Sequence, residues 1–147
     1  MRAKSFVEFW GVVLHPSINR CIIHLLVACD GDEIIGYLQV IETNNAAVFE
    51  IKSMAVVKLR QGEGIGRTLI EAAVLHCREC NGHRLIVSTA TADIGNLRFY
   101  QRQGFRMYRI VQDAFNSAAG YAEGTLVDEI PLRDQVFLEL YLPALTD

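Results

Sequence analysis

The chain has 147 residues, of which 51% are hydrophobic and 21% charged, enough for one globular domain with a substantial core. A formal net charge of -3 and a pI near 5.8 argue against a generally basic surface and therefore against nucleic acid as a partner. No apolar run reaches the roughly 20 residues that cross a bilayer, so we expect a single cytoplasmic domain over residues 1–147 with no membrane partner.

The first predicted element is a short amphipathic helix over residues 5–18. Apolar residues recur there at helix-like intervals, and His15-Pro16 breaks the pattern. The apolar residues are Phe6, Phe9, Trp10, Val13 and Leu14.

Three strands are then predicted to form a meander. The apolar residues 21–29 indicate a buried strand, and an Asp-Gly-Asp turn leads to its antiparallel partner over residues 33–42. Gly36 in this partner indicates a β-bulge. A Thr-Asn-Asn turn precedes the third strand, over residues 46–57.

A glycine-rich stretch, Gln61-Gly62-Glu63-Gly64-Ile65-Gly66, joins the third strand to a helical pattern over residues 64–80. A helix that begins at such a loop presents free N–H groups and the positive end of its dipole, and glycines leave no side chains to block a ligand. Phosphate fits this arrangement. Glycines that only allow the turn from strand to helix would explain the same pattern.

The second half of the chain reads as strand, helix and two further strands. Residues 83–90 indicate a buried strand, and the helical crossover before it makes it parallel to the third strand. Asp93 suits the N-cap of a helix from Ile94 to about Gln103. Strands are then expected over residues 105–111 and 132–142.

The four cysteines, at positions 21, 29, 77 and 80, fit neither a disulfide scaffold nor a convincing zinc site. Cys77 and Cys80 lie inside a helical pattern without the turn that a zinc knuckle needs. We therefore expect reduced thiols and no metal.

Two motifs resemble those of the GNAT N-acetyltransferases. The stretch from Gln61 to Gly66 is similar to that family's Gln/Arg-x-x-Gly-x-Gly/Ala pyrophosphate loop. Asn96 and Tyr100, followed by Gly104-Phe105, resemble its Asn-x-x-x-x-Tyr and Gly-Phe signature, with allowance for variable spacing. The motifs occur in the family's order, and the resemblance covers roughly residues 22–142.

The resemblance implies an α/β fold of the α+β type, with a central, mostly antiparallel sheet, one splayed parallel pair and flanking helices. It also implies acetyl-CoA as the acetyl donor, with its pyrophosphate on the glycine loop and its pantetheine arm along the third strand. The amide of Val56 or Val57 would meet the thioester carbonyl. The implied cofactor-binding residues are Ala55, Val56, Val57, Gln61, Gly62, Glu63, Gly64, Ile65, Gly66, Arg67, Thr68 and Asn96.

Two residues are candidates for catalysis. Tyr100 would be the general acid, because a phenol placed against the sulfur can protonate the departing CoA thiolate. Glu50 would be the base that accepts the proton of the amine, and its place before the loop resembles that of the glutamate base in the histone-acetylating branch. The alternative for Glu50 is a solvent-facing strand residue, with water as the base.

The resemblance implies an enzyme that moves acetyl to a primary amine of a small molecule by direct attack in a ternary complex. A peptide or protein amine, or a non-catalytic CoA-binding module, are the alternatives. The family usually has a strand and two helices before the hairpin, whereas only about twenty residues precede Cys21 here. We therefore expect a shortened N-terminal helical part, or a homodimer in which a partner subunit supplies the missing wall.

Overall fold

The computed structural model describes residues 6–15 and 21–144, with the backbone alone for residues 6–15, 21 and 22. The chain divides into two compact units. The first comprises Met1–Leu85 and Tyr141–Asp147, and the second comprises Ile86–Leu140. The single-domain assignment made from the sequence stays a prediction.

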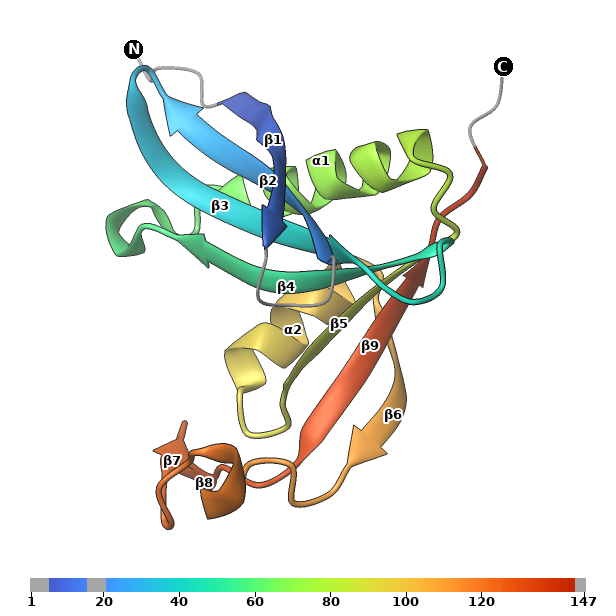
Figure 1. The fold of residues 1–147 in the computed structure, drawn as a ribbon. Coiled ribbons are helices and arrows are strands. Elements are labelled where there is room, and N and C mark those ends of the chain that lie inside the picture. The colour runs from blue at the N-terminus through green and yellow to red at the C-terminus, as the bar shows by residue number, and fades with distance from the viewer. Residues whose placement is uncertain (1–5, 16–20, 145–147) are drawn as a thin grey trace. The chain divides into compact units, whose positions relative to one another are not determined.

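The first unit contains four antiparallel strands in the order β1-β2-β3-β4 (Figure 1). Their bounds are β1 Phe6–His15, β2 Cys21–Asp30, β3 Glu33–Glu42 and β4 Val48–Val56. The predicted meander is confirmed, and the register shift between Ala28 and Cys29 puts a bulge beside Gly36.

A parallel pair starts in the same unit, at β5 (Arg84–Ala90). The amides of His83 and Arg84 donate to Ala47 O at 2.7 and 3.2 Å, so β5 starts beside the start of β4 and runs in the same direction. The predicted mixed sheet with one parallel pair is thus confirmed.

The predicted N-terminal helix is wrong over residues 6–15, which form strand β1, antiparallel to β2. The segment is rich in valine and aromatic residues, which suit a pleated strand, and Gly11 disfavours a helix interior. Residues 5 and 16–18 of that prediction lie outside the described part. The homodimer, which was predicted from the missing N-terminal wall, stays a prediction.

Helix α1 (Ile65–Glu79) packs its apolar side onto the strands of the first unit (Figure 1). The buried residues repeat at helical spacing and are Ile65, Leu69, Ile70, Ala73 and Cys77. Gly36 allows the start of the helix to approach β3, because a Cβ there would lie 3.1 Å from Ala55 O and 3.3 Å from Leu69 Cδ1.

A buried histidine connects β2, β3 and α1. His24 is 5% exposed, its Nδ1 lies 2.7 Å from His76 Nε2, and its Nε2 lies 3.3 Å from Glu42 Oε1. Burial lowers the pKa of His76, and the neighbouring charge of His24 acts in the same direction. The core of the first unit thus contains a hydrogen-bonded polar chain, whose burial is tolerated because each ring has a partner.

Helix α1 ends at Glu79, one residue before the predicted end of the helical pattern, and Asn81 and Gly82 have separate roles just after it. Asn81 takes the left-handed conformation, with φ 62°, which asparagine tolerates. Gly82 is needed for space, because a Cβ there would lie 2.8 Å from both Cys77 O and Phe49 Cδ2.

The second unit has the strand order β5-β9-β6, with β6 antiparallel to β9. Their bounds are β6 Arg106–Val111 and β9 Gln135–Tyr141, and helix α2 spans Ile94–Arg102. Asp93 is the predicted N-cap, since its Oδ1 accepts a hydrogen bond from Asn96 N at 3.0 Å. Neither helix in the described ranges is long and apolar enough to span a bilayer.

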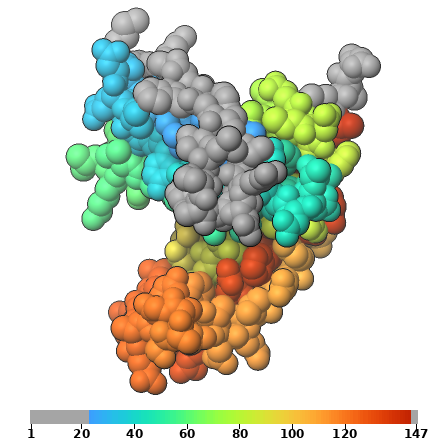
Figure 2. Space-filling model, viewed as in Figure 1, coloured from blue at the N-terminus to red at the C-terminus, as the bar shows by residue number. Residues whose placement is uncertain are grey.

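Between β6 and β9 lies a surface segment, orange in Figure 2, in which no helix or strand was predicted from the sequence before Leu132. It contains a short 3-10 helix, η2 (Ser117–Ala119), and a hairpin of β7 (Leu126–Val127) and β8 (Ile130–Pro131). The last strand therefore starts at Gln135 and not at the predicted Leu132.

Replacing Gly82 by alanine should destabilise the fold by about 1–3 kcal/mol, because the new methyl group overlaps the backbone at Cys77 and the ring of Phe49. Urea unfolding of the wild type and the variant measures the difference.

Gly95→Ala is the matched control. A Cβ at Gly95 meets only Asp93 Oδ1 at 3.7 Å, and alanine is the better helix former by about 1 kcal/mol. Equal effects of the two substitutions would contradict the crowding inferred at Gly82.

Candidate functional site

The glycine-rich loop opens to solvent at the end of β4. A 3-10 helix, η1 (Lys58–Arg60), follows β4 and leads through Gln61 to the loop, which is part of the green projection in Figures 1 and 2. Gly62 and Gly64 have φ of 81° and 84°, and a Cβ at either would meet nothing within 4 Å. The loop therefore leaves room for a ligand, and its left-handed positions favour glycine.

The start of α1 carries unpaired backbone donors. No side chain caps this end, and within the described ranges no acceptor is recorded for the N–H groups of Ile65, Gly66 and Arg67. These groups and the helix dipole suit an anion. Thr68 Oγ1 donates to Gly64 O at 2.9 Å. The largely exposed Arg67 pairs with Glu71 at 3.0 Å.

The end of β4 has one backbone amide directed away from β3. Val57 N donates to Ile35 O at 2.9 Å, and Gln61 Nε2 donates to Val56 O at 3.1 Å. Because successive residues of a strand point their amides to opposite edges, the N–H of Val56 faces away from β3. Of the two predicted amide donors, Val57 is already engaged.

Arg60, the last residue of η1, was not among the site residues predicted from the sequence. Its Nη1 lies 2.7 Å from Asp30 Oδ2, and its Nε lies 2.6 Å from Glu63 Oε2. These hydrogen bonds, that to Asp30 first, raise the pKa of Arg60 above its ordinary value. The spacing of Arg60 and Glu63 was the one local signal, while the partner thirty residues earlier depends on the fold.

Glu50 lies in β4 between the buried Phe49 and Ile51, and it is half-buried opposite Ile41 of β3. Because Glu50 is paired with Ile41, the two side chains lie on the same side of the sheet. Gly36 of β3 faces α1, and Ile41, an odd number of residues further along the same strand, therefore points away from the helix. The glutamate is therefore neither a fully exposed strand residue nor part of the α1 interface.

Two further polar residues that the sequence reasoning passed over share this side of the sheet. Tyr37 Oη and Ser53 Oγ lie 2.9 Å apart, joining β3 to β4 across the surface. A tyrosine and a serine alone carry no sequence signal for this pairing, which follows from strand register.

Tyr100 lies on α2 in the second unit and is only 6% exposed. Its ring makes edge contacts with Phe99 and Phe105, at centroid distances of 5.2 and 5.6 Å. Burial, with a smaller contribution from the charge of Asp93, raises the pKa of Tyr100 to about 12. The phenol thus keeps its proton at neutral pH and can act only as a proton donor there.

Asn96 lies one helical turn before Tyr100 and is exposed. Its Nδ2 donates to Thr89 Oγ1 at 3.3 Å, which holds the side chain toward the end of β5. The second unit thus contains Asn96 and Tyr100, whereas Glu50 and the residues from Ala55 to Thr68 belong to the first.

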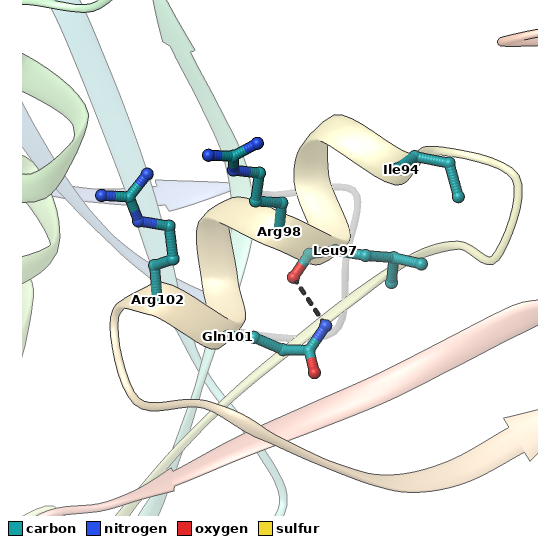
Figure 3. A pocket seen from close by; sticks show the side chains of 5 residues that line it. All are labelled: Ile94, Leu97, Arg98, Gln101 and Arg102. Atoms are coloured by element: carbon teal, nitrogen blue, oxygen red, sulfur yellow. Dashed lines mark hydrogen bonds between the residues drawn. The ribbon is translucent and has the colours of Figure 1, made fainter.

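An open hollow of about 530 Å³ lies along the exposed side of α2 (Figure 3). Arg98 and Arg102 line it one helical turn apart, and Gln101 Nε2 donates to Leu97 O at 3.0 Å. The remaining lining residue is Ile94. Tyr100 does not line this hollow.

The described ranges contain no side-chain cluster that could bind a metal ion, and the cysteines described there are not in disulfides. No group of three histidine, cysteine or acidic side chains there could hold a metal ion. Cys29, Cys77 and Cys80 are free thiols. Burial raises the pKa of Cys77 to about 12, so it is a poor nucleophile and a poor metal ligand.

Comparison with known proteins points to one family. The family model of the acetyltransferase (GNAT) domain matches residues 22–107. A relative in Bacillus subtilis (strain 168), the uncharacterized N-acetyltransferase YvbK, is 31% identical over 112 residues, which cover 76% of this chain and 70% of that protein.

Solved structures agree in fold. A Bacillus subtilis acetyltransferase in complex with CoA has a TM-score of 0.80 at 26% identity, covering 95% of this chain and 100% of the other. A GNAT family acetyltransferase from Elizabethkingia anophelis with acetyl-CoA bound has a TM-score of 0.74 at 28% identity, covering 82% and 76%.

Proposed function

The chain belongs to the GNAT acetyltransferase family, and on this premise we propose that it transfers acetyl from acetyl-CoA to a primary amine of a small molecule. The observation that carries the proposal is the set of unpaired N–H groups at the start of α1. They lie beside Gly62 and Gly64, where no atom occupies the space of a side chain. Such a set of donors suits a diphosphate. The two solved structures described above, from Bacillus subtilis and Elizabethkingia anophelis, contain CoA and acetyl-CoA, respectively.

In this proposal the diphosphate of acetyl-CoA binds to backbone amides between Gln61 and Gly66. Arg67 adds a positive charge, and Thr68 stabilises the first turn through its hydrogen bond to Gly64. Ala55, Val56 and Val57 flank the pantetheine arm, and Asn96 donates a hydrogen bond to it. Because the Val57 amide is engaged with Ile35, we assign the contact with the thioester carbonyl to the amide of Val56.

The proposed reaction is a direct attack. The lone pair of a neutral amine forms the C–N bond at the thioester carbonyl, and the C–S bond then breaks. Tyr100 donates its phenolic proton to the leaving sulfur, which gives CoA as the free thiol, and regains a proton from solvent. The pKa of about 12 keeps the phenol protonated until this step.

We propose Glu50 as the group that takes the proton lost by the amine nitrogen. Support comes from its half-buried place in β4, the strand that leads to the glycine loop. A carboxylate accepts such a proton directly or through a water molecule and passes it to solvent.

A cationic acceptor is favoured by charge. The formal net charge is -3, and acids recur in the surface segment before β9, where they attract an ammonium group. These acids are Asp113, Glu123, Asp128, Glu129 and Asp134. We also propose a cytoplasmic location, since the three thiols described are free, as expected in a reducing compartment.

The first prediction of this proposal is amine-dependent release of free CoA thiol from acetyl-CoA. A panel of aminoglycosides, polyamines and short peptides, assayed with a thiol reagent, should give release with at least one small amine. Release with peptides alone would reassign the acceptor. Thermal stabilisation by acetyl-CoA without release across the whole panel would indicate a non-catalytic CoA-binding module.

Tyr100→Phe should lower kcat by roughly 100-fold while leaving the Kd for acetyl-CoA within about twofold, because only the proton donor is lost. Tyr108→Phe makes the same chemical change on the exposed strand β6 and should leave kcat unaltered. Unchanged turnover in Tyr100→Phe would remove Tyr100 from the mechanism.

Glu50→Gln should lower kcat/KM at pH 7 by roughly 100-fold and change the acidic limb of its pH profile, since the amide cannot accept the proton. Glu33→Gln, at an exposed position of β3, is the control. If the pH profile of Glu50→Gln matches that of the wild type, water or another group is the base.

A further inference from the structure

Arg60 links the glycine-rich loop to the end of β2, a part of the first unit that is distant in the sequence. It ends η1, directly before Gln61, and its guanidinium contacts Asp30 at the end of β2 and Glu63 within the loop. The two contacts use different nitrogens, so both form together, and each is a charge-assisted hydrogen bond.

These ion pairs are better shielded than an ordinary surface pair. The side chains of Arg60, Asp30 and Glu63 are 28%, 21% and 30% exposed, whereas Arg67 and Glu71 in the neighbouring pair are 71% and 62% exposed. Partial removal from water strengthens the attraction between opposite charges. The Arg60 pairs are therefore the stronger restraint on this part of the chain.

The loop needs such a restraint. Gly62 and Gly64 have unusual freedom of backbone rotation, and no neighbouring atom packs where their side chains would be. Core packing therefore does not hold these two glycines. The side-chain hydrogen bonds at this point come from Arg60, from Gln61, which donates to Val56 O, and from Thr68, which donates to Gly64 O at the start of the helix.

Charge gives Arg60 a second role. Glu63 puts a carboxylate in the loop that would receive a diphosphate, and like charges at short range oppose binding. The 2.6 Å contact with Arg60 Nε offsets that negative charge and directs the carboxylate to the guanidinium.

We propose that Arg60 is a positioning residue for acetyl-CoA, one that holds the glycine-rich loop in its binding conformation and masks the charge of Glu63. The inference rests on the proposed function, because it needs acetyl-CoA as the ligand of the loop. Arg60 acts here through Glu63 and Asp30 and does not itself contact the ligand.

A double-mutant cycle on binding tests this proposal. Isothermal titration with acetyl-CoA, in the absence of amine, measures Kd for the wild type and for Arg60→Ala, Glu63→Gln and the double variant. Arg60→Ala should raise Kd roughly tenfold, as expected for lost hydrogen bonds between charged groups. Glu63→Gln alone should raise Kd by less than Arg60→Ala does, because it weakens one contact of Arg60 and leaves the pair with Asp30 in place.

The decisive comparison is in the Arg60→Ala background. There Glu63→Gln should lower Kd by roughly threefold or more, because it removes a carboxylate that has lost its partner. A purely structural role for Arg60 would give no such rescue. The value of kcat at saturating acetyl-CoA should stay within about twofold in Arg60→Ala.

Arg133→Ala, which removes a positive charge from an exposed side chain of the second unit, is the matched control and should leave Kd unchanged. Arg60→Gln is measured in parallel as a polar replacement. The inference would be overturned if the wild type binds acetyl-CoA and the Arg60 variants bind it with the same Kd. It would also be overturned if Arg60→Ala and the double variant lose the same amount of affinity. Unfolding of both Arg60 variants would also overturn it, whereas absence of wild-type binding would overturn the proposed function itself.

Discussion

The close approach of α1 to β3 is the constraint on which the glycine-rich loop depends. A side chain at position 36 would press against Ala55 O and Leu69, so glycine there lets the first turn of α1 lie directly on the sheet. The buried side of the helix then fixes its axis. Because the helix starts where the loop ends, this packing also sets the direction of its unpaired N–H groups. The open loop therefore rests on a well-packed base.

Most of the first unit follows from local pattern, and its failures have a common cause. Strands β2 to β4 and helix α1 carry strong periodicity, clear turn residues and a marked helix stop at Asn81, so their existence and order could be predicted. The apolar residues of β1 fit helical and extended spacing alike, and the outcome depends on hydrogen bonding to β2. The pairing of Arg60 with Asp30 likewise joins positions that only the folded chain brings together.

In the second unit, local motifs predicted the helix and its cap, whereas the effect of burial on pKa could be read only from the structure. The Asp93 cap and the helix carrying Asn96 and Tyr100 were visible in the sequence, because capping and spacing are local. The raised pKa of Tyr100 comes from its burial and is invisible in the sequence. The hairpin of β7 and β8 was missed because its turn uses Asp128 and Glu129 in the left-handed region, without the usual glycine or asparagine.

The bare start of α1 has a consequence for the stability of the whole chain. Helix α2 has Asp93 as its cap, whereas α1 begins at Gly64 with no side chain to complete its first turn. An anion bound to this turn would supply the missing hydrogen bonds, so ligand and cap would be the same chemical group. By thermodynamic linkage, the free energy of unfolding then rises with ligand concentration, by about 2.7 kcal/mol when the free ligand is at one hundred times its Kd. Folding and cofactor supply would be coupled through one uncapped helical turn.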